Sequence, residues 1–210
     1  MNRRQRRTHV REGQAADLIL RDEQHRTANE LSSALAALRL TSRQHGAGAL
    51  PLVDCAIERL EGYVAVRRLL VAPEAQGCEL VELLRELSIA MARGRLVAGG
   101  IRVVTSTLRV QVVPKLASAV LRLAHEMLTN ALKHGTPSEE IVLSMRVSRR
   151  HLSLKCRNPC DGPQPTSTGR RGLRIMRALC EERDGRFRTS RSEEGFTAIA
   201  TLPRLPRPDI

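Results

Sequence analysis

The segment LAHEMLTNALKHG, residues 123–135, combines side chains suited to binding a metal-bound polyphosphate. At the angular step of a helix, its polar groups fall within an arc of roughly 100° on one side. They are a carboxylate, an amide, an ammonium and an imidazole, from Glu126, Asn130, Lys133 and His134. Oxygen donors can hold a magnesium ion that keeps several waters, while cationic groups neutralise phosphate oxygens. The spacing therefore suits a metal-bound polyphosphate, and geometry alone leaves an ordinary solvated helix face as an equal alternative.

The other side of the same helix, predicted over residues 114–134, is apolar. It collects Ala117, Leu121, Ala124, Leu128, Ala131 and Leu132. We expect this side to pack on a sheet and the polar side to be presented to solvent.

A further helix, predicted over about residues 170–182, begins behind glycines. Gly169 and Gly172 precede Leu173 in TGRRGLRIM. Free backbone amides and the helix dipole at such a start favour anions. Glycines alone are weak evidence, but their place after the polar helix and a strand strengthens the prediction of a phosphate site.

An exposed imidazole is predicted in the first helix of the chain. In RDEQHRTANEL, His25 lies at least about 60° outside the leucine stripe of residues 20–38. Near neutrality such a ring is partly unprotonated and can attack phosphorus. Taken alone, a histidine of this kind is more often a surface residue without a role.

The string HEMLTNALKHG closely resembles the N box of histidine kinases and their GHKL ATPase relatives, where E-x-x-x-N-A-x-K-H is a specific motif. The resemblance implies ATP and magnesium as cofactors, with Asn130 ligating the metal and Glu126 supporting it. It also implies that Lys133 and His134 lie beside the phosphates. The stretch TGRRGLRIMRALCEERDGRF resembles the glycine box and its following helix, with Gly169 and Gly172 as the glycines, and EEGFTAIATLP resembles the closing strand pair. The resemblance covers about residues 78–203.

The pattern H-R-x-x-N at His25, upstream of an N box, resembles the phospho-acceptor box of HWE-type and related bacterial sensor kinases. This implies that His25 accepts the phosphoryl group and that Glu126 belongs to the catalytic set. Arg26 stands where many kinases have an acidic residue, so the base for the imidazole proton stays open, with Glu23 as a candidate. His125 neighbours the N box but is expected to point about 100° away from Glu126.

The sequence departs from the family at the adenine-binding box. The family has D-x-G-x-G after its middle strands, where this chain has KCRNPCDGPQP. Alignment on the strand places Asn158 at the aspartate, Cys160 at the first glycine and Gly162 at the second. Asparagine can accept a hydrogen bond but lacks the charge, so adenine affinity should fall. The alternative alignment uses Asp161 with Gly162 and a shifted loop.

Hydrophobic periodicity predicts an α+β chain in two parts. A basic tail, residues 1–11, precedes a helical hairpin, residues 12–75, for dimerisation and histidine phosphotransfer. Its helices are expected over about 12–44 and 50–70, with apolar stripes that predict pairing with a second copy or docking on the rest of the chain. The segment APEAQG, residues 72–77, is the candidate linker.

Residues 78–205 are expected to form a two-layer α/β sandwich of the GHKL ATPase type. Helices interleave there with a mixed, largely antiparallel sheet. The first of these helices is CELVELLRELSIAMARGRL, and the strands are GIRVVTS, LRVQVV, EEIVLSMRV, HLSLKCR, GRFRTS and FTAIATLP.

Composition bounds the location and the partners. No apolar run is long enough to cross a bilayer, and the arginine-rich start lacks the apolar core of a secretory signal, so a cytoplasmic protein without membrane contact is expected. The net charge of +13 favours an acidic partner. Nucleic acid is disfavoured, because aromatic residues make up 1% and single strands need stacking platforms. A homodimer and a response-regulator receiver domain are the expected partners, with an unidentified partner supplying the signal.

These observations favour a histidine kinase core that phosphorylates His25 from ATP and passes the group to a regulator aspartate. The second hypothesis is a histidine phosphotransferase relay, whose ATPase-like domain has kept its fold and lost nucleotide binding. The third is a module that binds nucleic acid or a regulator through its basic surface.

Overall fold

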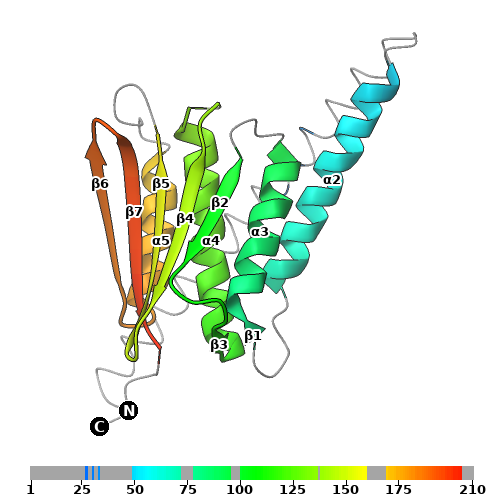
Figure 1. The fold of residues 1–210 in the computed structure, drawn as a ribbon. Helices are drawn as coiled ribbons and strands as arrows, with labels where there is room; N and C mark the ends of the chain where they lie inside the picture. The colour runs from blue at the N-terminus through cyan, green and yellow to red at the C-terminus, as the bar shows by residue number, and fades with distance from the viewer. Residues whose placement is uncertain are drawn as a thin grey trace, which may run out of the picture.

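A computed structural model of the chain describes residues 27, 30, 33, 49–71, 78–95, 100–136, 138–159 and 169–204. They form a layer of helices, α3, α4 and α5, behind one sheet, with α2 against the outer side of α3 (Figure 1). The helices are α2 (Ala49–Val71), α3 (Leu80–Arg95), α4 (Pro114–His134) and α5 (Gly169–Glu181). The strands are β1 (Cys78–Glu79), β2 (Ile101–Thr105), β3 (Gln111–Val112), β4 (Ile141–Val147), β5 (His151–Asn158), β6 (Arg186–Ser192) and β7 (Gly195–Pro203).

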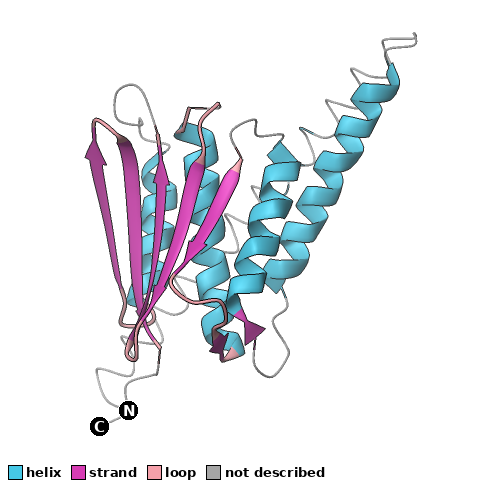
Figure 2. Cartoon of the chain, viewed as in Figure 1, coloured by secondary structure: helices cyan, strands magenta, loops and turns pink. Residues whose placement is uncertain are grey.

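The main sheet is five-stranded, in the order β2-β4-β5-β7-β6. β2 runs parallel to β4, and the other neighbours are antiparallel. Alternate residues of each inner strand point to the helices, as a sheet with one covered face requires. Leu143, Met145, Leu154 and Ala200 are buried on that side. The described helices all lie on this side, and none of the described elements packs on the other face of the sheet (Figure 2).

Helix α4 is the centre of the helical layer. Pro114 begins it, where the missing N–H costs nothing, and it ends where the Gly135 N–H donates to the Ala131 carbonyl at 2.7 Å. Its contacts with α2, α3, α5, β4 and β5 enclose its first half, so Ala119 and Leu123 are buried although they lie on the polar side of the wheel. Its last turns emerge from this enclosure.

Helix α2 packs closely on α3 at a pair of glycines. A Cβ on Gly62 would lie 2.5 Å from the Gly94 nitrogen and 2.7 Å from the Ala90 carbonyl oxygen. Only glycine allows the two backbones to approach in this way. Helix α2 therefore docks on the rest of the chain through Ala56, Val66 and Leu70, while Ile57 and Val64 of its predicted apolar stripe stay exposed.

The α+β architecture with a mixed, largely antiparallel sheet is confirmed, and α4 has the predicted bounds. The strand expected at LRVQVV is reduced to β3, which pairs with β1 outside the main sheet. The first hairpin helix, the basic tail and the linker lie outside the described residues. None of the described helices has the length and hydropathy needed to cross a bilayer.

Candidate functional site

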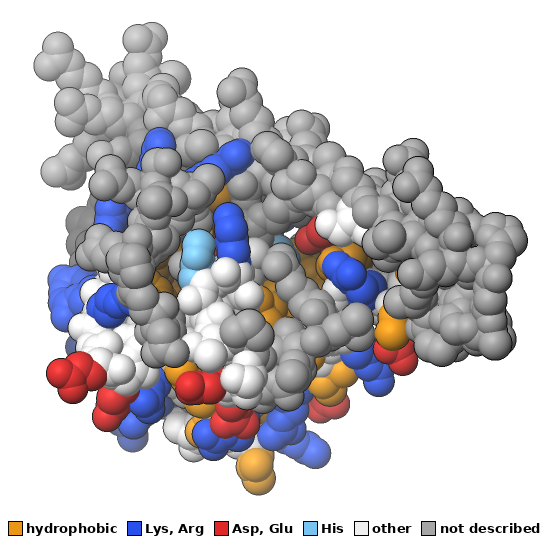
Figure 3. Space-filling view, turned by 90° about the horizontal axis from the view of Figure 1, so that it is seen from above, with side chains coloured by type: hydrophobic (Ala, Val, Ile, Leu, Met, Phe, Trp, Pro, Cys, Tyr) orange, Lys and Arg blue, Asp and Glu red, His pale blue; other side chains and the backbone are white. Residues whose placement is uncertain are grey.

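The end of α4, the end of β5 and the start of α5 meet at one end of the molecule. A Cβ on Gly135 would lie 3.2 Å from Asn158 Nδ2, and the Thr136 N–H donates to the Pro159 carbonyl at 3.1 Å. Seen from above, histidine and lysine or arginine side chains gather at this end (Figure 3). The fold therefore brings together residues that sequence analysis assigned to separate motifs.

Asn130 and Gly172 face each other across the α4–α5 contact. Asn130 Oδ1 lies 4.0 Å from where a Gly172 Cβ would be, and among the described residues beyond the helix's own backbone and the neighbours of Gly172 no other atom lies within 4 Å. The described residues thus leave space beside Gly172, and it adjoins an amide oxygen of the kind that binds magnesium. Both residues were predicted for the nucleotide site, one as a metal ligand and one as part of a phosphate-binding helix start.

The basic start of α5 adds a feature that sequence analysis did not use. Gly169 begins the helix, and Arg170 and Arg171 follow in its first turn without an acidic residue. Cations at a helix N-terminus are repelled by the positive end of the helix dipole. An anion bound there would offset this repulsion. The signal was visible in the string GRRG, but the interpretation of that string rested on its glycines alone.

Glu126 is more enclosed than the helical wheel predicted. Its side chain was expected on the solvated face, but the residue is only 8% exposed, because neighbouring helices cover the first part of that face. The expectation that His125 points away is also wrong, since its Nδ1 lies 3.6 Å from Glu126 Oε1. The two residues are about 100° apart around the helix, but their side chains are flexible enough to bend toward each other. His125 is therefore a neighbour of the predicted site.

Lys133 and His134 occupy the open end of α4. Lys133 is exposed, and His134 is half-buried. In the described part of the chain, the buried Nε2 of His134 has no hydrogen-bond partner. Burial lowers the pKa of His134 below its ordinary 6.5, and the adjacent Lys133 charge lowers it further. A buried imidazole nitrogen without a partner is costly unless some group hydrogen-bonds to it, so it fits a site that a ligand completes.

Asn158 ends β5 and is 3% exposed. The neighbouring Gly195, at φ 123°, lets the β6–β7 turn approach it: a Cβ there would lie 2.3 Å from the Asn158 carbonyl oxygen. Asn158 is thus enclosed by neighbouring backbone at the edge of the site. Gly162, Asp161 and His25 lie outside the described residues, so their predicted roles stay predictions.

No protein-family model matches the sequence, and comparison with curated proteins gave no match. Solved structures do match in fold. The catalytic domain of the histidine kinase ThkA is 20% identical over 62% of this chain and 97% of that domain, with a TM-score of 0.51. The histidine kinase domain of the blue-light-activated kinase from Erythrobacter litoralis is 19% identical over 81% of this chain and 94% of its own, with a TM-score of 0.50.

A bacterial phosphotransferase covers more of this chain, 89%, and 95% of its own, at 11% identity and a TM-score of 0.57. At these identities the likeness concerns the fold. The resemblance read from the N box and the fold of the described residues agree, and the chain is built on the fold of a bacterial histidine kinase core.

Proposed function

We propose that the chain is a histidine kinase core in which residues 78–205 hold Mg-ATP between α4 and α5 and transfer its γ-phosphoryl group to His25. The phosphoryl group then passes to an aspartate of a response-regulator receiver domain. The observation that carries the proposal is the open space at Gly172, which lies beside Asn130 Oδ1 at the basic start of α5. An amide oxygen, a helix N-terminus and nearby cations are together suited to a metal-bound triphosphate.

Each residue then has a defined task. Asn130 supplies an oxygen ligand to magnesium, which neutralises phosphate charge when bound. Glu126, enclosed beside His125, supports that arrangement from within the helix layer. Lys133 is placed for the phosphates, and His134 Nε2 can take a hydrogen bond from, or donate one to, a group in the site.

The transfer step is a displacement at the γ-phosphorus. A nitrogen of His25 forms the N–P bond, the bond from the γ-phosphorus to its bridging oxygen breaks, and ADP leaves. The imidazole proton goes to a base, for which Glu23 is the candidate. Positioning and charge neutralisation supply most of the rate in such reactions.

A second candidate is the histidine phosphotransferase relay. Asn158 lacks the charge of the family aspartate, and a bacterial phosphotransferase matches 89% of this chain in fold. The backbone contact at Gly62 also fixes α2 on α3, whereas a kinase must bring its nucleotide to the acceptor histidine. In the relay, His25 receives its phosphoryl group from one phosphorylated regulator and passes it to a second regulator.

One experiment separates the two candidates. The purified chain is incubated with γ-labelled Mg-ATP, and acid-labile, alkali-stable phosphate is measured. The kinase predicts label in the wild type and in His151→Gln, a control on an exposed histidine, with loss of label in His25→Gln and Asn130→Asp. If the wild type stays unlabelled yet accepts phosphate from a phosphorylated receiver domain, the relay is correct.

The proposed homodimer has its own support. Ile57, Val64 and Ile89 are exposed along a groove of about 740 Å³ between α2 and α3. An apolar helical face of this kind fits a further helix, as in a bundle of paired hairpins. Sedimentation equilibrium should show a dimer that Ile57→Ser with Val64→Ser weakens, and a monomer in the wild type would contradict this part of the proposal.

A further inference from the structure

The open face of the sheet carries a concentration of basic side chains that the proposed function does not use. Strand register places these residues in rows that cross the sheet. One row is Arg146, Ser153, Thr201 and Arg186, and the next is Ser144, Lys155, Ile199 and Arg188. Adjacent rows lie about 7 Å apart, and neighbouring strands about 4.8 Å. No acidic residue occurs in either row.

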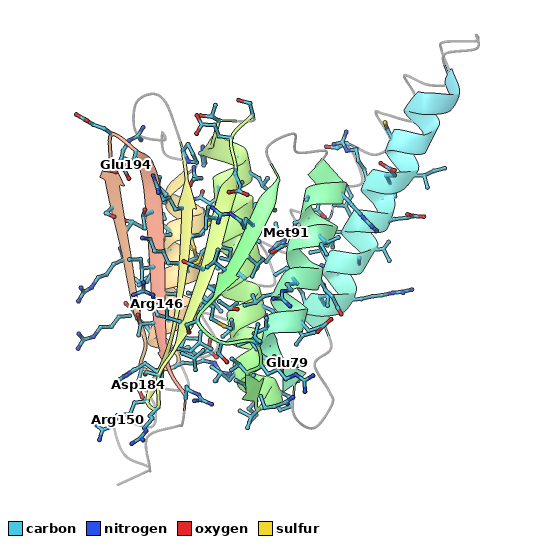
Figure 4. The ribbon with its side chains drawn as sticks, viewed as in Figure 1. Glu79, Met91, Arg146, Arg150, Asp184 and Glu194 are labelled. Carbon is cyan, nitrogen blue, oxygen red and sulfur yellow. The ribbon has the colours of Figure 1, made fainter. Side chains whose placement is uncertain are left out.

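The cations in these rows lack ion-pair partners among the described residues. In the part of the chain that the structure describes, no carboxylate pairs with Arg146, Lys155, Arg186 or Arg188. We call the surface that they form the basic face. All of them are exposed, and Arg146 lies over the middle of the sheet (Figure 4).

Acidic side chains border the basic face without entering it. The third row is Arg102, Val142, Arg157, Thr197 and Ser190. Here Glu140 pairs with Arg102 at 2.8 Å and Glu194 pairs with Arg157 at 2.9 Å. The cations at the Glu194 end of the sheet are therefore neutralised, while those toward Arg150 are not (Figure 4). Uncompensated charge is confined to one part of the sheet, so it is not a uniform result of an arginine-rich composition.

Hydroxyl groups and a shallow groove accompany the cations. The groove holds about 560 Å³ and is lined by Ser106, Ser144, Ser153, Arg146 and Lys155, among others. Hydroxyls can donate to carboxylate or phosphate oxygens, and guanidinium groups bind such oxygens in pairs. Hydroxyl and guanidinium groups together are therefore suited to binding a polyanion.

We propose that the basic face docks an acidic segment or surface of a partner protein. An extended acidic segment places carboxylates on alternate residues about 7 Å apart, which matches the distance between rows. The two rows span about 14 Å across the four strands and about 7 Å along them, which with the reach of the long side chains suits the smaller transient protein contacts. The inference does not depend on the proposed kinase or relay chemistry.

Other polyanions and a second copy fit less well. A duplex is convex and meets a flat sheet along a strip, and no aromatic side chain occurs in these rows to stack on the bases of a single strand. The basic face of a second copy would be repelled, because it carries the same uncompensated cations.

The test uses the full chain and a fluorescein-labelled peptide of alternating glutamate and serine. Binding is followed by fluorescence anisotropy in low and in physiological salt. The triple variant Arg146→Thr, Lys155→Thr, Arg188→Thr removes the basic face with residues that favour strands. Its matched control, Arg68→Gln, Arg85→Gln, Arg93→Gln, removes the same charge from exposed positions of α2 and α3.

We expect the strand variant to bind the peptide roughly tenfold more weakly and the control variant less than about threefold. The variant Arg146→Lys with Arg188→Lys should keep most of the affinity, which guards against a folding defect in the triple variant. Equal losses in both triple variants would overturn the proposal, because only net charge would then matter. Tighter binding of duplex DNA or of anionic vesicles that is lost in the strand variant would also overturn it in favour of that ligand.

Discussion

Two helix contacts in this molecule each contain a glycine, and the two glycines have opposite effects on how closely the helices pack. At the α2–α3 contact, Gly62 brings two backbones together, with a Cβ position only 2.5 Å from the Gly94 nitrogen. At the α4–α5 contact, Gly172 leaves a space where, among the described residues beyond its own helix backbone and chain neighbours, Asn130 Oδ1 is the nearest atom, at 4.0 Å. The first contact is closed by packing, and the second is open beside polar groups. A contact that is filled contributes stability, while one left open beside polar groups can hold a ligand.

The largest effect is expected at the closed contact. Gly62→Ala should lower the free energy of unfolding by about 2–3 kcal/mol, because the added methyl group overlaps backbone atoms that cannot rotate away. Urea denaturation monitored by circular dichroism measures the change. Glu61→Ala, at an exposed neighbouring position, should change stability by less than about 0.5 kcal/mol. Equal stability of the two variants would mean that α2 is not fixed on α3 in solution.

A smaller effect is expected at the rim of the open contact. Asn158→Asp restores the charged acceptor of the family motif and should raise ATP affinity about tenfold, since hydrogen bonds to a charged group are roughly twice as strong. Calorimetric titration with ATP, and with inosine triphosphate as a control that lacks the amino group, tests this. Unchanged ATP affinity, together with a loss in Asp161→Asn, would favour the alternative alignment of the adenine box.

The same alanine substitution should have the opposite sign at the open contact. Gly172→Ala places a methyl group in ordinary van der Waals contact and replaces glycine inside a helix. We expect a gain of about 0.5–1 kcal/mol in the free energy of unfolding. A loss of stability at Gly172 as large as that at Gly62 would remove the distinction between the two contacts.

The elements of this fold were largely readable from the sequence, because each has a clear hydrophobic period. The apolar stripe from Ala117 to Leu132 predicted α4, and alternation in HLSLKCR predicted β5. LRVQVV shows the same alternation, yet Leu108 is 81% exposed and only Gln111–Val112 is a strand. Alternation reports which residues can form a strand, whereas pairing depends on which neighbouring edge is available.

The sequence predicted which of these residues lie near one another but not how deeply each is buried. Spacing placed Glu126 and Asn130 on one side of α4, as found, and alignment on β5 placed Asn158 at a rim that the structure brings next to Gly135. The burial of Glu126 was missed because a helical wheel contains no information about the helices that cover it. The approach of His125 to Glu126 was missed because side-chain flexibility is absent from the wheel.

The smallest effect concerns the pH dependence of the open contact. Burial, and then the charge of Lys133, hold the pKa of His134 below 6.5 in the folded chain. Between that lowered pKa and 6.5 the unfolded chain binds more protons than the folded chain, so His134 stabilises the fold above about pH 6.5 and this contribution is lost as the pH falls. His134→Gln should therefore lose less stability than the wild type when the pH is lowered from about 7.5 to about 5.5.

Phosphate groups beside His134 would reverse that preference, because an anion favours the imidazolium form. Mg-ATP binding near pH 6 should then take up protons, which calorimetry in buffers of different ionisation enthalpy measures directly. His134→Gln should abolish the proton uptake. His151→Gln, at the opposite end of β5 from Asn158, should not change it. Proton release on binding, or uptake that persists in His134→Gln, would show that the phosphates lie elsewhere and that the open space at Gly172 is not their site.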